Sequence, residues 1–393
     1  MFDLKKIQNY LRQEGKDAWL FYNFHNIDPS ANAILDIPPQ AILTRRWFYL
    51  VPAQGEPSKL VHKIEKGALD HLPGSKREYA MWKQLHDEIN GMLASCRHIC
   101  MQYSPMNAIP YVSFVDAGTI ELVRTTGVTI HSSANLIQEF EAIWSKDGLE
   151  CHLVSAEKLH KLVELTFAYV REQIKQGAAI NEYQVQQFMV GQFRQMNMVF
   201  SDPPIVAVNE HSGNPHYEPM AQGSAPIKQG DLLLLDLWAK ENKPEAVYAD
   251  ITWVGVVDKK LPDEPRKVFG IVRDARDAAT KLVMDRFAAG KEIAGFEVDD
   301  AARSVIQKAG YGDYFVHRTG HSIGKEVHWK GVNMDNFETK DERKLIDGIG
   351  FSIEPGIYLN KFGIRSELNI YIAQGKPHVS GQPIQQELIP ILA

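Results

Sequence analysis

Hydrophobic and polar positions follow two different periods along the first 150 residues. Apolar residues at helical spacing predict helices over 5–14, 82–93 and 114–123. Short apolar runs of strand type predict strands at 18–22 and 98–103 and a hairpin from 47–53 and 59–63. This alternation predicts a compact α/β domain. Its Asp, Glu and His residues have no clustered ligand spacing, so we assign it no chemistry.

The second half begins with a stronger helical pattern. Apolar residues at 159–174 recur at steps of three and four, and Ser155 is placed to cap the start of that helix. Asn181 and Gln184 have the spacing of a capping box, which predicts a second helix over about 182–196.

The same order of elements then repeats. The predicted elements after the second helix are strands at 204–208, 231–238 and 246–257, helices at 264–289 and 298–309, and strands around 316, 351–358 and 364–372. Helices followed by strands, twice, predict an internal duplication around a shared sheet, although the two copies share no evident residue identity. We predict two domains, residues 1–152 and residues 153–393.

Composition narrows the possible partners. The chain is 44% hydrophobic and 23% charged, with a net charge of −6 and no long run of Lys and Arg. We therefore expect neither a nucleic-acid nor a membrane partner. The N-terminus lacks the apolar core of a signal peptide, and no window reaches the roughly 18 apolar residues of a membrane span. Three cysteines without paired spacing favour reduced thiols and a cytoplasmic location.

Four acidic residues interrupt apolar strand-like runs of the second half. They are Asp236, Asp250, Glu354 and Glu367. A charge buried alone costs several kcal/mol, so an isolated acid in a strand ordinarily lies on a solvated face. Four such acids in one domain instead favour a shared site. Four carboxylates together require cations, so their convergence would imply a two-metal site.

Histidines add a nitrogen ligand to this set. The segment HRTGHSIGKEVH contains His317, His321 and His328, with Gly320 and Gly324 allowing close backbone approach to a site. A single histidine is more often a packed or surface residue, but three in this span favour a site. His216, in the turn GNPHY, would by itself be interpreted as a loop residue.

These motifs resemble a known family. The runs LLLDLWA, YADITW, HRTGHSIG, SIEPGIY and RSEL are similar to the five-ligand signature of the pita-bread metallopeptidases. That group includes methionine aminopeptidase, aminopeptidase P and prolidase, with creatinase as a relative without the metal site. The resemblance covers about residues 155–390, and the first half is similar to the N-terminal domain of the aminopeptidase P, prolidase and creatinase branch. It implies a creatinase-like α/β domain followed by an α+β pita-bread catalytic domain.

The resemblance also implies a role for each ligand. Asp236 would chelate one metal ion, Asp250 and Glu367 would bridge both ions, and His321 with Glu354 would hold the other. Carboxylates with one imidazole suit Mn²⁺, Fe²⁺, Co²⁺ or Zn²⁺, and oxygen-rich coordination favours manganese.

Further residues would act on the substrate. The resemblance implies that His216 and His328 contact the substrate or the tetrahedral intermediate, that His317 shapes the pocket, and that Arg365 steadies the acidic cluster. A pair of metal ions can supply a hydroxide for attack on the peptide carbonyl. Glu354 would then relay a proton to the leaving nitrogen, and His328 would donate to the oxyanion.

Two positions depart from the family pattern. The two aspartates are 14 residues apart, a longer interval than usual, so the hairpin around residues 242–245 is extended and could alter the mouth of the site. Leu368 stands where an acid often follows the last glutamate.

The combined prediction is a cytoplasmic, homodimeric exopeptidase that cuts the Xaa-Pro bond, either in dipeptides or in longer peptides. The homodimer follows from the resemblance alone. The alternatives are a creatinase-like C–N hydrolase and a binding protein that has lost catalysis. Arg343 is similar in position to an arginine with which some prolidases bind a carboxylate. Its mixed-charge segment, 340–344, instead favours a solvated loop.

Overall fold

The computed structural model describes residues 2–393 and divides the chain after Glu141 into two compact units. This division precedes the predicted boundary at 152/153, which lies inside one continuous helix, α6 (Lys146–Lys175). The predicted cap was wrong. Ser145 caps α6 by accepting from Gly148 N, at 3.0 Å, whereas Ser155 lies within the helix and donates to the Cys151 carbonyl.

The first unit is built on a six-stranded mixed sheet in the order β4-β3-β2-β1-β5-β6. The strands are β1 (Ala18–Asn23), β2 (Trp47–Pro52), β3 (Ser58–His62), β4 (Ser75–Tyr79), β5 (His98–Met101) and β6 (Thr129–Ser132). The helices are α1 (Leu4–Gln13), α2 (Pro29–Ile34), α3 (Trp82–Leu93), α4 (Ala117–Arg124) and α5 (Ala134–Ile137). Alternate residues of β1 pack on opposite faces, with Trp19 and Phe21 in one core and Leu20 and Tyr22 in the other.

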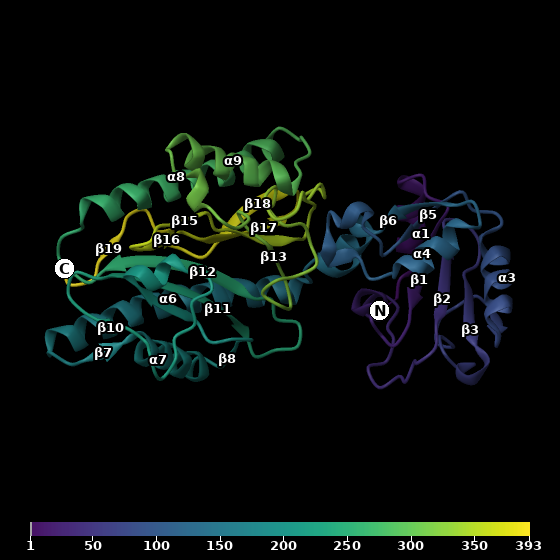
Figure 1. The fold of residues 1–393 in the computed structure, drawn as a ribbon, viewed down its shortest axis with the longest axis horizontal. Helices are drawn as coiled ribbons and strands as arrows, with labels where there is room; N and C mark the ends of the chain where they lie inside the picture. The colour runs from purple at the N-terminus through teal and green to yellow at the C-terminus, as the bar shows by residue number, and fades with distance from the viewer. Residues whose placement is uncertain (1) are drawn as a thin grey trace. The chain divides into compact units, whose positions relative to one another are not determined.

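The second unit places its helices on both sides of its strands, as Figure 1 shows for α6 with α7 and for α8 with α9. The helices after α6 are α7 (Glu182–Gln195), α8 (Asp263–Ala288) and α9 (Gly295–Lys308). The predicted capping box of α7 is confirmed, because Asn181 Oδ1 accepts from Gln184 N and Gln184 Oε1 accepts from Asn181 N. Among residues 2–393, no helix is both long enough and apolar enough to cross a membrane.

Two main sheets lie between these helices. The first has the order β19-β12-β11-β8, with β9 also paired to β11, and the second has the order β13-β14-β17-β18. Their strands are β8 (Met198–Val199), β9 (Ile205–Val208), β11 (Leu232–Glu241), β12 (Ala249–Val256), β19 (Ile389–Pro390), β13 (Ser322–Ile323), β14 (Gly350–Ile353), β17 (Leu368–Ala373) and β18 (Lys376–Ser380). Two further pairs are β7 (Ile180–Asn181) with β10 (Pro226–Ile227), and β15 (Gly356–Tyr358) with β16 (Gly363–Arg365).

Three strand predictions need correction. Val316 lies outside any strand, after the short helix η6 (Gly312–Tyr314). The single strands predicted at 351–358 and 364–372 are each divided, into β14 with β15 and β16 with β17. The first division falls at Glu354 and Pro355, because proline has no N–H for the ladder. A predicted metal ligand lies at each interruption, Glu354 at the first and Glu367 at the second, outside the regular strand pairing.

The antiparallel hairpin β11–β12 has two distinct faces, because successive side chains of a strand point to opposite sides. The helix face carries Leu233, Leu235, Leu237, Ile251 and Trp253, which pack in one core with residues of α6 and α7. The site face carries Asp236, Trp238, Asp250 and Thr252. Farther along the site face, Leu234 and Val254 join the core that contains residues of α8 and α9.

Candidate metal centre

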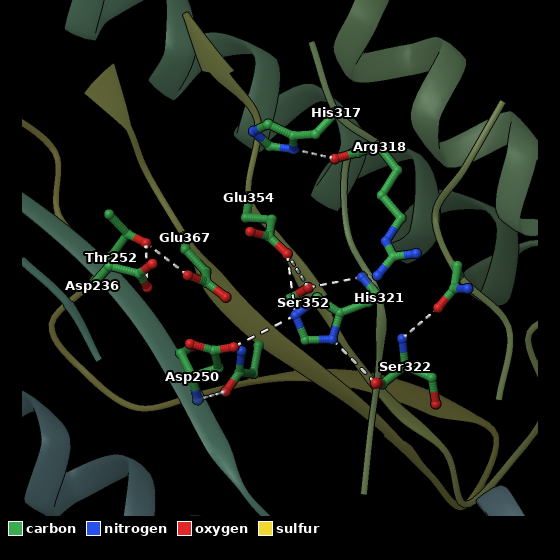
Figure 2. Close-up of polar contacts among 12 residues, drawn as sticks. Asp236, Asp250, Thr252, His317, Arg318, His321, Ser322, Ser352, Glu354 and Glu367 are labelled. Atoms are coloured by element: carbon green, nitrogen blue, oxygen red, sulfur yellow. Dashed lines mark hydrogen bonds and ion pairs between the residues drawn. The ribbon is translucent and has the colours of Figure 1, made fainter. Parts of the chain in front are cut away.

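The structure brings the five predicted metal ligands together from separate segments (Figure 2). They lie on β11, on β12, immediately before β13, after β14 and immediately before β17. The side chains of Asp236, Asp250, His321 and Glu367 are buried, with at most 7% of each residue exposed. Glu354 is slightly more open, with 15% of its side chain exposed.

The imidazole of His321 lies close to two carboxylates. His321 Nε2 lies 3.5 Å from Asp250 Oδ2 and 3.2 Å from Glu354 Oε1. One ligand atom from each of Asp250, His321 and Glu367 lies within 4.8 Å of the other two. This spacing is compatible with ligands that share a cation.

Two buried carboxylate oxygens of this group have no hydrogen-bond partner among residues 2–393. They are Asp250 Oδ1 and Glu367 Oε1. A buried, unpaired carboxylate oxygen is costly unless a cation or a donor satisfies it. These oxygen donors and the adjacent imidazole nitrogen therefore fit a divalent metal ion.

The carboxylates of the cluster are buried and repel one another, which raises the pKa values of several of them. Burial, together with the charges of Asp250 and Glu354, raises the pKa of Asp236 to about 7 despite the nearby Arg365 guanidinium. Burial also raises the pKa of Asp250, and burial with the surrounding carboxylates raises the pKa of Glu367 well above its usual range. All three shifts show that this pocket disfavours uncompensated negative charge.

Glu354 has the opposite balance. Burial would raise its pKa, but the charges of His321 and Arg365 outweigh burial and lower the pKa. Ser352 organises this part of the site, since its hydroxyl donates to Glu354 Oε1 at 2.9 Å and accepts from His321 N at 2.9 Å. His321 Nδ1 faces the Ser322 carbonyl at 3.1 Å, which leaves Nε2 directed at the carboxylates. Burial lowers the pKa of His321, but Asp250 and Glu354 outweigh it and raise the pKa.

Gly320 explains how His321 comes so close to Glu354. A Cβ at Gly320 would lie 2.0 Å from the carbonyl oxygen of Ser352, so no larger residue fits without a shift. The expected close backbone approach is therefore present. Its partner is strand β14 of the protein itself, and the approach sets the distance between two candidate ligands.

Arg365 binds the acidic cluster from one side. It forms an ion pair with Asp236, its Nε donates to Thr252 Oγ1 at 3.0 Å, and its Nη1 donates to the hydroxyl of Tyr358 at 3.0 Å. Thr252 Oγ1 also lies 3.1 Å from Asp236 Oδ1 and 2.8 Å from Glu367 Oε2. A hydroxyl has one proton, so it can donate to only one of these carboxylates at a time.

Thr252 and Asn369 are site residues that the sequence analysis missed. Thr252 follows Asp250 by two residues on the same strand, so strand alternation alone could have placed it on the site face. Asn369 follows Glu367 by two residues. Its side chain accepts from Asp250 N at 2.9 Å and donates to Asp250 O at 2.7 Å, which fixes the backbone of β12 at the ligand.

Two predicted substrate histidines adjoin the cluster. His317 Nε2 lies 2.7 Å from the hydroxyl of Tyr358, and burial lowers its pKa to about 4. The ring of His328 lies 4.2 Å from that of His321, with the rings perpendicular. The charge of His321 and burial lower the pKa of His328 to about 3, and Arg318 and His216 contribute in the same direction. The positive charge of Arg318 acts to lower the pKa of His321 as well, an influence that the sequence analysis did not assign.

His216 is exposed, and a buried glutamate anchors its segment. Glu182, at the start of α7, accepts from Val208 N at 2.8 Å, from Ala225 N at 2.7 Å and from the hydroxyl of Tyr217 at 2.6 Å. The imidazole of His211 also contacts this carboxylate, at 2.9 Å. Glu182 therefore ties together both ends of the irregular segment that presents His216.

Both interpretations of Arg343 were wrong. Arg343 is 2% exposed and binds the fully buried Asp341 through two nitrogens, at 2.9 and 2.6 Å. Its third nitrogen donates to the Lys330 carbonyl at 2.8 Å. Arg343 is thus neither part of a solvated loop nor available to a substrate carboxylate. Alternate residues of a mixed-charge run point inward here because the buried carboxylate compensates the guanidinium.

The hairpin between Asp236 and Asp250 supports the segment that leads to His328. Tyr248 N donates to the Gly324 carbonyl at 2.9 Å, and Lys325 Nζ lies 2.9 Å from Glu245 Oε2. Lys240 Nζ donates to the Lys325 carbonyl at 2.5 Å. Residues 240–248 thus hold the 324–328 segment in place through these contacts.

A family model described as metallopeptidase family M24 matches residues 155–374. The chain belongs to this family. The M24 chain is 35% identical over 164 residues to a Xaa-Pro dipeptidase of Lactobacillus helveticus, an alignment that covers 42% of this chain and 40% of that relative. The chain therefore spans about two fifths of the length of that curated relative.

Solved structures extend the likeness of the M24 chain over its whole length. A prolidase from Thermococcus sibiricus has a TM-score of 0.61 at 22% identity, and the match covers 98% of each chain. A dipeptidase from Mycobacterium ulcerans has a TM-score of 0.67 at 19% identity and covers 98% of this chain and 96% of that chain. The predicted fold, an α/β domain followed by a pita-bread domain, is confirmed. Membership of this metallopeptidase family also implies the use of divalent metal.

Proposed function

We propose that the chain is an exopeptidase that depends on two divalent metal ions and hydrolyses Xaa-Pro bonds at the N-terminus of peptides. One observation carries this proposal. Asp250, His321 and Glu367 converge, and two of their buried oxygens lack a protein partner among residues 2–393. The M24 match and the printed activity of the Lactobacillus helveticus relative support the choice of reaction.

In this proposal Asp236, Asp250, His321, Glu354 and Glu367 hold the ions, and the oxygen-rich donor set favours manganese. When bound, such ions polarise a carbonyl oxygen and lower the pKa of water from 15.7 toward about 7. Arg365 keeps Asp236 and Thr252 in place, since its three nitrogens already bind Asp236, Thr252 and Tyr358. We therefore assign Arg365 to the support of the acidic cluster.

The remaining residues handle the proton and the substrate. Glu354 is ionised because its pKa is lowered, so it can accept a proton and pass it to the leaving nitrogen. His328 is neutral because its pKa is near 3, so its imidazole can donate one N–H to the carbonyl oxygen as negative charge develops there. His216 and His317 would line the substrate pocket beside these groups.

The test combines metal analysis with a substrate panel. Manganese-loaded protein is offered Xaa-Pro dipeptides, longer peptides that begin with Xaa-Pro, and matched Xaa-Ala peptides. We expect two ions per subunit, release of the residue before proline, and loss of activity after chelation. Product identity decides between dipeptides and longer peptides. Trace metal with full activity would contradict metal dependence, and release of urea from creatine would favour the C–N hydrolase.

Assembly and location belong to the same proposal. We propose a cytoplasmic homodimer, as the resemblance to the aminopeptidase P and prolidase branch implies. Light scattering of the purified protein measures the assembly directly. A mass equal to one chain of 44.4 kDa at working concentration would contradict the dimer.

A further inference from the structure

Trp238 is an aromatic residue on the site face of the hairpin. It follows Asp236 by two residues on β11 and stands directly opposite Asp250 in the β11–β12 register. Directly opposed residues of an antiparallel pair project to the same side, with their Cβ atoms close together. The indole therefore lies next to one of the candidate metal ligands.

The surroundings of Trp238 form an apolar wall. Its half-buried indole packs in a small cluster with Tyr248, Ile323 and Val327. Ile323 follows His321 by two residues, and Val327 immediately precedes His328. The wall thus connects the acidic cluster with the segment that carries the predicted oxyanion donor.

The indole N–H of Trp238 is a hydrogen-bond donor without an acceptor in the described part of the chain. Trp238 Nε1 is buried from solvent and has no hydrogen-bond partner among residues 2–393. Asp250 Oδ1, on the residue directly opposite, is also buried and unpaired. Buried donors without a partner are rare and costly in folded proteins. On the site face, a bound molecule can supply the missing acceptor.

We propose that Trp238 is a specificity-determining residue. Its ring lines a subsite for the apolar groups that flank the scissile bond, and its N–H donates to a carbonyl or carboxylate oxygen of the peptide. This inference rests on the proposed peptidase function. It assigns to one residue both a preference for apolar substrates and one polar contact.

Two substitutions separate the two contributions. Trp238→Phe keeps an aromatic wall and removes the donor, so kcat/KM should fall about 2- to 13-fold, the equivalent of one neutral hydrogen bond. Trp238→Ala removes the wall, so the ratio of kcat/KM for Leu-Pro over Gly-Pro, or for Leu-Pro over Leu-Ala, should fall as well. Trp253→Phe is the matched control, because Trp253 lies on the helix face of the neighbouring strand. Unchanged rates and ratios in both Trp238 variants would overturn the inference.

A second measurement does not depend on hydrolysis. In zinc-loaded protein with ¹⁵N-labelled tryptophan, whose diamagnetic metal leaves nearby signals visible, the indole signal that Trp238→Phe removes should shift when a Leu-Pro analogue with a reduced peptide bond binds. The Trp253 signal should stay in place. Wild-type protein that cleaves Xaa-Pro peptides while the Trp238 signal stays unchanged would overturn this inference alone. Wild-type protein that neither cleaves nor binds them would overturn the proposed function with it.

Discussion

The two faces of the β11–β12 hairpin are built from alternate residues of the same strands, yet they do different things. On the helix face, Leu233, Leu235 and Leu237 are fully buried in an apolar core. On the site face, Asp236 and Asp250 are buried almost as completely, at 7% and 5% exposure. Burial alone therefore does not distinguish structural from chemical positions. The two kinds of position are distinguished by the residues from other segments that contact them.

The site face depends on residues that arrive from far along the chain. Arg365 pairs with Asp236, and Asn369 fixes the backbone of Asp250. These contacts span 129 and 119 residues. The helix face depends on dispersion and on the exclusion of water, which many apolar neighbours can provide. We therefore expect substitutions on the site face to change chemistry and substitutions on the helix face to change stability.

The largest expected effect is on the site face. Glu367→Gln preserves shape but removes the charge of a proposed bridging ligand, so we expect loss of both ions and of detectable hydrolysis. Elemental analysis and the Xaa-Pro assay measure these outcomes. Asp263→Asn is the control, because that carboxylate is 95% exposed. Retention of two ions with undiminished activity would remove Glu367 from the centre.

A helix-face substitution should do the reverse. Leu235→Ala deletes a fully buried side chain, so we expect the free energy of unfolding to fall by about 2–5 kcal/mol. Metal content and the kcat/KM of the folded protein should remain as in the wild type. Urea unfolding and steady-state kinetics test both statements. If Leu235→Ala instead lost metal at an unchanged stability, the separation between the two faces would fail.

His328 lies beside the proposed metal ligands but is not one of them, so its substitution should affect the rate without removing metal. His328→Ala should lower kcat by about 10²–10³-fold, as removal of one oxyanion donor does elsewhere, while KM changes much less. The exposed His378 provides the control variant His378→Ala. A change confined to KM would reassign His328 to ground-state binding.

A pH-dependent effect on stability is expected from a buried, neutral histidine. His152, on α6, is fully buried between the Tyr248 carbonyl and the Ser380 hydroxyl, and burial lowers its pKa to about 4. In the unfolded chain the pKa of His152 is near 6.5. Between pH 6.5 and 4, His152 is therefore protonated in the unfolded state but neutral in the folded state. Stability is therefore fully present above pH 6.5 and falls by about 3 kcal/mol as the pH drops to 4.

His152→Gln tests this linkage. The variant should lose some stability at pH 7 but show a flatter decline between pH 6.5 and 4 than the wild type. Urea unfolding at several pH values provides the comparison. Parallel pH profiles for the two proteins would mean that His152 does not contribute to acid unfolding.

Much of the fold was accessible from local patterns. The helix at 82–93 and the capping box at Asn181 follow from apolar spacing and from side chains that satisfy backbone groups within one turn. Some element predictions were wrong, and not only where distant residues decide the outcome, because Ser145 caps α6 through the nearby Gly148 N. A strand was expected around residue 316, and α6 was expected to start later than it does.

The sequence by itself determined the identity and order of the candidate ligands, because acids inside apolar strands and a glycine-flanked histidine are visible without coordinates. Only the tertiary structure decided how close these groups lie and what surrounds them. It placed Thr252 between two carboxylates, buried Arg343 against Asp341, and set Trp238 opposite Asp250 with its N–H unpaired. The physical reason is that hydrophobic spacing acts over a few residues, whereas the compensation of a buried charge requires groups brought together from distant segments.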